Sequence, residues 1–220
     1  MIARPPAPRA ILFDWDNTLV DSWPPIHAAM NATLAAMGHP VWTLDETRAR
    51  VRRSLREAFP DMFGDRWEAA RDVFYDSFRD HHLETLAARP GAGEMLAGIA
   101  GQGLYLGVVS NKMGSYLRRE AAHLGWTDYF GRLVGATDAP RDKPAVDPVA
   151  LALAGSGVSP GPEVWFVGDT AIDMACARNA GCFAVLVGDL GPDAAEFVDQ
   201  PPDLDFRDFT TFQEVVRGLV

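Results

Sequence analysis

The chain has 220 residues, of which 48% are hydrophobic and 23% are charged, as is ordinary for a globular protein. Its length is enough to bury one substantial core and leaves room for a smaller second one. Its formal net charge of −10 argues against nucleic acid or an anionic membrane as a main partner, because both bind clustered Lys and Arg. No apolar run reaches membrane-spanning length, the Pro-rich segment Met1–Arg9 has no secretory core, and the two cysteines suggest a reducing compartment, so we expect a cytoplasmic protein.

The first predicted element is a buried strand over Ile11–Phe13, which leads directly into the polar sequence Asp14-Trp15-Asp16-Asn17-Thr18. Side chains two residues apart on an extended chain point the same way, so we expect Asp14 and Asp16 to converge on one small volume. A divalent cation or a shared proton would relieve their repulsion, and a bare carboxylate can act as a nucleophile toward a phosphoryl group. The alternative interpretation is a polar turn that follows a core strand.

A helical block is predicted to follow, because no convincing strand occurs between residues 21 and 88. Apolar residues at helical spacing and capping signals predict three helices, which cover residues 26–37, 47–59 (closed by Pro60) and 67–88. We therefore expect a separate helical domain, residues 21–88, inserted after the first strand.

Strands and helices alternate in the rest of the chain. The predicted strands cover residues 104–109, 132–134, 164–167 and 183–187, and the predicted helices cover 114–124, 148–153, 172–180 and 209–219. Such alternation is typical of a parallel sheet with helices on both faces. We expect an α/β core with a doubly wound parallel sheet, built from residues 1–20 and 89–220.

Three further polar clusters lie near the ends of these elements. Ser110-Asn111 follows a strand and suits a phosphate oxygen, Lys143-Pro144 lies in a loop before a helix, and Gly168-Asp169 leads to Asp173 at a helix start. Each cluster has a plainer alternative, namely helix capping or a solvated lysine. Lys occurs only at Lys112 and Lys143 in this Arg-rich chain, which hints that an ammonium group is needed at these positions. Four carboxylates at two strand ends make an oxygen-rich site that suits Mg²⁺.

With these four clusters in this order, the chain resembles the haloacid dehalogenase superfamily of phosphohydrolases, and within it the phosphoglycolate phosphatase-like members with a helical cap of the first class. The matching segments are Asp14-x-Asp16-x-Thr18, Ser110-Asn111, Lys143-Pro144 and Gly168-Asp169-x-x-x-Asp173. The resemblance covers essentially the whole chain. One departure is Asp142, where those relatives usually carry Gly.

The resemblance implies a Mg²⁺-dependent phosphatase that hydrolyses a small phosphate monoester through an aspartyl-phosphate intermediate. Asp14 would be the nucleophile and Asp16 the general acid and base. Thr18, Ser110, Asn111 and Lys143 would bind the phosphate. The metal ligands would be Asp14, the backbone carbonyl of Asp16, and Asp169, with Asp173 supporting a metal-bound water.

Other members of the family fit the residues less well. A dehalogenase has no use for a metal and lacks the second catalytic Asp, and a phosphonatase needs a cap lysine that residues 21–88 do not contain. A sugar phosphomutase and a non-catalytic phospholigand-binding member stay open as alternatives. The expected partner is a small phosphorylated metabolite, and the expected assembly is a monomer or homodimer. The residues that choose the substrate are expected in the cap, with candidates in the segment His39–Thr43 and at Arg48, Arg52 and Arg53.

Overall fold

The computed structural model describes residues 5–51 and 53–220, apart from the side chains of Asp80 and His81. The expectations for Met1–Arg4 and for Arg52 therefore fall outside the described residues. The chain divides into two compact units, Met1–Val20 with Ala88–Val220 (the core unit) and Asp21–Ala87 (the helical unit). Among the described residues, no helix combines the length and hydropathy that a membrane span requires.

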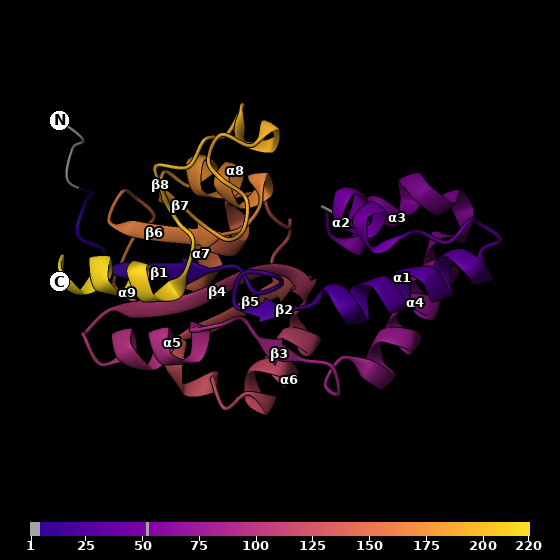
Figure 1. Ribbon diagram of the computed structural model, residues 1–220, viewed down its shortest axis with the longest axis horizontal. Coiled ribbons are helices and arrows are strands. Elements are labelled where there is room, and N and C mark those ends of the chain that lie inside the picture. Colours follow the sequence, from indigo (N-terminus) through magenta and orange to yellow (C-terminus); the bar gives the residue numbers. More distant parts are fainter. Residues whose placement is uncertain (1–4, 52) are drawn as a thin grey trace. The chain divides into compact units, whose positions relative to one another are not determined.

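The core unit is built on a six-stranded sheet whose strands run in the order β5-β4-β1-β6-β7-β8, with every described pairing parallel (Figure 1). This confirms the predicted α/β class. The chain starts in the middle of the sheet, builds outward to one side and then returns to build the other side. At such a switch in strand order, the carboxyl ends of the central strands leave room for a ligand. The strands are β1 (Ala10–Phe13), β4 (Tyr105–Met113), β5 (Arg132–Ala136), β6 (Val164–Gly168), β7 (Phe183–Val187) and β8 (Leu204–Phe206).

Helices cover both faces of this sheet, which explains why its central strands are apolar at consecutive positions. On one face Leu12 and Phe166 pack with residues of α7 (Asp147–Leu153) and α8 (Ala171–Asn179). On the other face Phe13 and Trp165 contact Phe212 of α9 (Phe209–Arg217) edge to face. Helix α5 (Ala92–Ala100) packs beside α9, and α6 (Gly114–His123) packs against β4 and β5.

Three details of the core unit differ from the sequence-based expectation. Strand β4 continues to Met113, so Ser110, Asn111 and Lys112 lie within the strand and not in a loop after it. A register shift relative to β5 between Val109 and Met113 accompanies this extension. Helix α5 and strand β8 were not predicted, because α5 starts from the Gly-rich segment at residues 91–93 and β8 has only three residues.

The helical unit consists of α1 (Trp23–Ala36), α2 (Leu44–Arg50), α3 (Leu55–Phe63), a 3₁₀ turn at Gly64–Arg66 and α4 (Trp67–His81). The expected single helix over 47–59 is wrong, because the backbone is extended at Val51 and a new helix begins after Ser54. Pro60 lies inside α3 and does not end it. Phe59 and Phe63, on either side of Pro60, are both buried and contact each other edge to face, so tertiary packing holds the residues around Pro60.

The last predicted helix of this unit also ends earlier than expected. Helix α4 stops at His81, and residues 87–88 instead form strand β3 (Ala87–Ala88), which pairs with β2 (Val20–Asp21) in a separate two-stranded sheet. Strand pairing at Ala87 requires an extended backbone, so the helix cannot continue to residue 88 as its composition suggested.

Candidate active site

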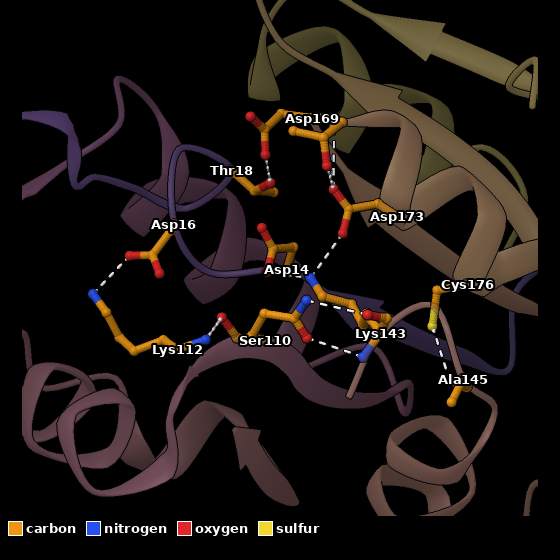
Figure 2. Close-up of polar contacts among 12 residues, drawn as sticks. Asp14, Asp16, Thr18, Ser110, Lys112, Lys143, Ala145, Asp169, Asp173 and Cys176 are labelled. Carbon is orange, nitrogen blue, oxygen red and sulfur yellow. Dashed lines mark hydrogen bonds and ion pairs between the residues drawn. The ribbon is translucent and has the colours of Figure 1, made fainter. Parts of the chain in front are cut away.

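The residues singled out in the sequence gather where β1, β4 and β6 end, all within the core unit (Figure 2). Asp14 follows β1 directly, and its backbone N–H donates to the carbonyl of Val167 in β6 at 2.8 Å. Asp169 follows β6, and Asp173 lies in the first turn of α8. Parallel strands thus place carboxylates from distant parts of the chain at one edge of the sheet.

Lys143 is the cation at the centre of this group. Its Nζ donates to Asp14 Oδ1 at 2.6 Å and to Asp173 Oδ1 at 2.8 Å. All three side chains are buried, with residue exposures of 6% for Asp14, 2% for Lys143 and 0% for Asp173. An ammonium at this distance offsets the charge of the Asp14 carboxylate and fixes its direction.

Asp169 and Asp173 are each held by a hydroxyl. Thr18 Oγ1 donates to Asp169 Oδ1 at 2.7 Å, so the hydroxyl that was expected to face phosphate is engaged with a carboxylate in this structure. Asp173 Oδ2 accepts from the backbone N–H of Thr170 at 3.1 Å and from Thr170 Oγ1 at 2.6 Å, which closes a capping box at the start of α8. A Cβ at Gly168 would overlap the Asp173 side chain, so only glycine leaves room for this arrangement.

The charges of the cluster do not balance. Burial raises the pKa of Asp14 to about 7, Lys143 opposes this shift, and Asp173 and Asp16 add to it. Burial likewise raises the pKa of Asp169 well above its ordinary value, with Asp173 and Asp14 as further causes. Burial lowers the pKa of Lys143, but Asp14 and Asp173 outweigh that effect and raise it. Lys143 therefore stays protonated, and the cluster needs further positive charge to hold three ionised carboxylates.

A divalent cation fits this donor set. One carboxylate oxygen from each of Asp14, Asp169 and Asp173 lies within 4.8 Å of the others. Mg²⁺ prefers oxygen ligands and would supply the charge that the cluster lacks. Both oxygens of Asp173 are engaged, Oδ1 by Lys143 and Oδ2 by Thr170. In Asp14, Lys143 contacts Oδ1, and in Asp169, Thr18 contacts Oδ1. Oδ2 of Asp14 and Oδ2 of Asp169 are thus the oxygens best suited to direct contact with a cation.

The Asp16 side chain takes a different direction from the one that regular strand geometry predicts. Its carboxylate is absent from the cluster just described and instead lies 2.6 Å from Lys112 Nζ (Figure 2). Strand β1 ends at Phe13, and Asn17 has a positive φ of 63°, so the alternation of side chains does not extend through Asp16.

Lys112 was noted in the sequence only as one of two lysines, and the structure places it in a buried ion-pair group. Its Nζ contacts both carboxylate oxygens of Glu120 in α6, at 2.9 and 2.8 Å, and the Trp15 indole N–H donates to Glu120 Oε2 at 2.7 Å. Burial lowers the pKa of Lys112, but Asp16 and Glu120 outweigh it and raise the pKa. The spacing of 112 and 120 across a strand and a helix gave no sequence signal for this group.

Ser110 and Asn111 were expected to hold phosphate oxygens, and in this structure both make internal contacts. Ser110 Oγ accepts from the backbone N–H of Lys112 at 3.2 Å. Asn111 Oδ1 accepts from the Lys143 N–H at 2.9 Å, and Asn111 Nδ2 donates to the Lys143 carbonyl at 3.2 Å. Asn111 thus fixes the backbone of Lys143 to the end of β4.

The unusual Asp142 does not add a carboxylate to the cluster. It is buried, and its Oδ1 accepts from the backbone N–H of Thr137 at 3.4 Å, a residue with a positive φ of 75°. Its position before Lys143 therefore stabilises a neighbouring turn. The cluster of Asp14, Asp169 and Asp173 keeps Lys143 as its ammonium partner.

The chain is similar to known proteins over most of its length. Residues 11–187 match the family model described as haloacid dehalogenase-like hydrolase. A phosphoglycolate phosphatase of Chromobacterium violaceum is 31% identical over 189 residues, covering 82% of this chain and 85% of that protein. An N-acetylmuramic acid 6-phosphate phosphatase of Pseudomonas aeruginosa is 32% identical over 212 residues, covering 89% and 92%.

Solved structures show the same fold at lower sequence identity. A haloacid dehalogenase-like hydrolase from Bacteroides fragilis superimposes with a TM-score of 0.85 at 23% identity, covering 93% of this chain and 99% of that one. A predicted phosphoglycolate phosphatase from Haemophilus somnus gives a TM-score of 0.83 at 22% identity, covering 95% and 98%.

Proposed function

The chain belongs to the haloacid dehalogenase-like hydrolase family and is a phosphoric monoester hydrolase, and from this premise we propose that it hydrolyses a small phosphate monoester with Mg²⁺ through a phosphorylated Asp14. The observation that carries the proposal is the cluster of Asp14, Asp169 and Asp173, in which the Lys143 ammonium donates to Asp14 and Asp173. A buried carboxylate beside a fixed cation suits attack on phosphorus, because phosphoryl transfer depends mainly on positioning and charge stabilisation.

In the proposed reaction Asp14 attacks the phosphorus and the bond to the leaving oxygen breaks. Asp16 donates a proton to that oxygen, then takes a proton from the water that hydrolyses the aspartyl phosphate. Lys143 holds Asp14 in place and offsets charge on the phosphoryl oxygens, while Asn111 fixes the Lys143 backbone. A bound Mg²⁺ would neutralise charge on the phosphate and the carboxylates, and Asp14 and Asp169 would hold it, with Asp173 in support.

The substrate is proposed to be a small phosphorylated acid or sugar acid. The two curated relatives described above differ in the substrate that their names give, and their identities to this chain are nearly equal. Identity alone therefore does not choose between 2-phosphoglycolate and N-acetylmuramic acid 6-phosphate. We also propose a cytoplasmic location, which the free, buried Cys176 and Cys182 support.

Phosphate release from a panel of phosphate monoesters tests the proposal. The panel contains the two substrates named above together with p-nitrophenyl phosphate and hexose phosphates. Release of inorganic phosphate that depends on Asp14 supports a phosphatase. Isomerised sugar phosphate without net release would instead identify a phosphomutase, and binding without turnover of any panel member would identify a phospholigand-binding protein.

Chelation should lower the hydrolysis of p-nitrophenyl phosphate by about 10²-fold or more, because a bound cation contributes several kcal/mol of charge stabilisation. Added Mg²⁺ should restore the rate. Ca²⁺ should restore it poorly, since it prefers more ligands at longer distances. Initial rates after dialysis against EDTA, with each ion titrated back, measure this. An unchanged rate after exhaustive chelation would contradict the proposed metal site.

Replacement of Asp16 by Asn should lower kcat by about 10²- to 10⁴-fold with phenyl phosphate, because its phenolate leaving group needs a proton. The loss should be smaller with p-nitrophenyl phosphate, whose leaving group departs without protonation. The ratio of the two kcat values, measured for the wild type and for Asp16→Asn, is the readout. An equal loss for both esters would mean that Asp16 only shapes the site.

A further inference from the structure

Both lysines of the chain direct their ammonium groups to the two aspartates that follow β1. Lys143 Nζ lies 2.6 Å from Asp14 Oδ1, and Lys112 Nζ lies 2.6 Å from Asp16 Oδ1. Lys112 is only 9% exposed, and it and Lys143 are the two lysines of a chain whose other Lys/Arg positions are all arginine. A buried ammonium is costly to desolvate, so its position opposite the proposed general acid requires an explanation.

Besides its contact with Asp16, the Lys112 ammonium is held by Glu120. Glu120 is 1% exposed, and both of its carboxylate oxygens accept hydrogen bonds from Lys112 Nζ. The indole N–H of the fully buried Trp15 donates to Glu120 at 2.7 Å and fixes its position. The Trp15 ring also packs edge to face against Trp126, with ring centroids 5.8 Å apart. The ammonium is thus anchored among buried, packed side chains and lies beside Asp16.

Stability alone does not account for this group. Buried ion pairs often contribute no more than apolar residues of the same volume, because desolvation offsets the attraction. Glu120 by itself already supplies the countercharge that Lys112 needs. Lys112 nevertheless contacts a second carboxylate, that of Asp16, whose side chain is 20% exposed.

Asp16 has little else to fix its direction. It lies beyond the end of β1, its neighbour Asn17 has a positive φ, and its backbone forms an isolated bridge to Val20 and belongs to none of the strands. Within the described residues, Oδ1 of Asp16 has no hydrogen bond that meets the geometric criteria. The ion pair with Lys112 is therefore the polar contact that holds this oxygen.

We propose that Lys112, anchored by Glu120 and Trp15, is a positioning residue that fixes the carboxyl group of Asp16 for proton transfer. The inference rests on the proposed function, in which Asp16 serves as general acid and base. Misplacement of a reacting group by about 1 Å can cost about 10²-fold in rate. Loss of Lys112 should therefore lower kcat and leave KM nearly unchanged.

The test is a double-mutant cycle measured with phenyl phosphate. Lys112→Met combined with Glu120→Gln removes both charges of the Lys112–Glu120 pair at once, so that neither of these two residues leaves the other as an unpaired buried charge. In the Asp16 background this variant should lose about 10- to 100-fold in kcat, with KM within about twofold. In the Asp16→Asn background the same change should cost less than about twofold, because there is no acid left to position.

Arg118→Met is the matched control. Arg118 lies on the same helix as Glu120 and pairs with Asp138 at 2.7 Å, with its side chain 48% exposed. Its loss should leave kcat unchanged in both backgrounds. If the Lys112→Met/Glu120→Gln variant does not fold, Glu120→Gln alone keeps Lys112 and an acceptor for Trp15, and should give the same background dependence with a smaller loss.

An equal loss of kcat in both backgrounds, or no loss with Asp16 present, would overturn the positioning role while leaving the proposed function intact. Full activity of Asp16→Asn alone would instead remove Asp16 from the mechanism, and the inference about Lys112 would fall with it. The two failures are therefore distinguishable within one set of variants.

Discussion

Replacement of Asp14 by Asn should abolish turnover, with a loss of at least about 10⁴-fold in kcat, while the protein stays folded. The amide is nearly the same size as the carboxylate, but it cannot form an acyl phosphate. Asp14 is 6% exposed and bonded to Lys143 at 2.6 Å, and Lys143 keeps Asp173 as a partner in the variant. The loss should therefore be chemical and not structural.

Trapping of the intermediate identifies the residue directly. Borohydride reduction of enzyme quenched during turnover should convert a phosphorylated Asp14 to homoserine, which peptide mass spectrometry can place. Asp128→Asn, an exposed aspartate of the same unit, serves as the control and should keep full activity. Reduction at a different aspartate, or normal turnover by a pure Asp14→Asn preparation, would refute the assignment of the nucleophile.

Replacement of Lys143 by Met should reduce both activity and stability. The variant leaves Asp14 and Asp173 buried without their shared cation, and removal of one partner from a buried pair typically costs about 3–5 kcal/mol. kcat should fall by about 10³-fold or more, because the ammonium no longer offsets charge on the nucleophile and phosphate. Urea unfolding in the absence of added metal measures the stability, and phosphate release measures kcat.

Lys143→Arg separates charge from fit in this experiment. The guanidinium keeps the positive charge but is larger and planar, and Lys143 is only 2% exposed. We expect the Arg variant to recover part of the unfolding free energy and little of the activity. A Met variant that unfolds at the wild-type urea concentration and retains its kcat would show that the cluster does not depend on this cation.

Much of the core unit could be predicted because its strands are short apolar runs with polar residues at their carboxyl ends. The run Phe183–Val187 coincides with β7, and the run from Val164 differs from β6 by one residue. The helical unit was predicted less accurately, because its boundaries depend on tertiary packing. Aromatic contacts around Pro60 extend a helix that proline usually ends, and strand pairing at Ala87 shortens another.

The site shows the same division between local and long-range information. Motif order was enough to select Asp14, Lys143, Asp169 and Asp173, which the structure brings together. Local patterns could not reveal that Thr18 bonds to Asp169, since 151 residues separate the two. Nor could they reveal the Lys112–Glu120 pair, which depends on how α6 packs against β4.

The glycine at position 168 bears on efforts to alter this enzyme by directed evolution. Any side chain there would collide with Asp173, the residue that both starts α8 and binds Lys143. A substitution would therefore disturb helix initiation and charge balance together. Mutant libraries should keep codon 168 fixed and vary positions in the helical unit.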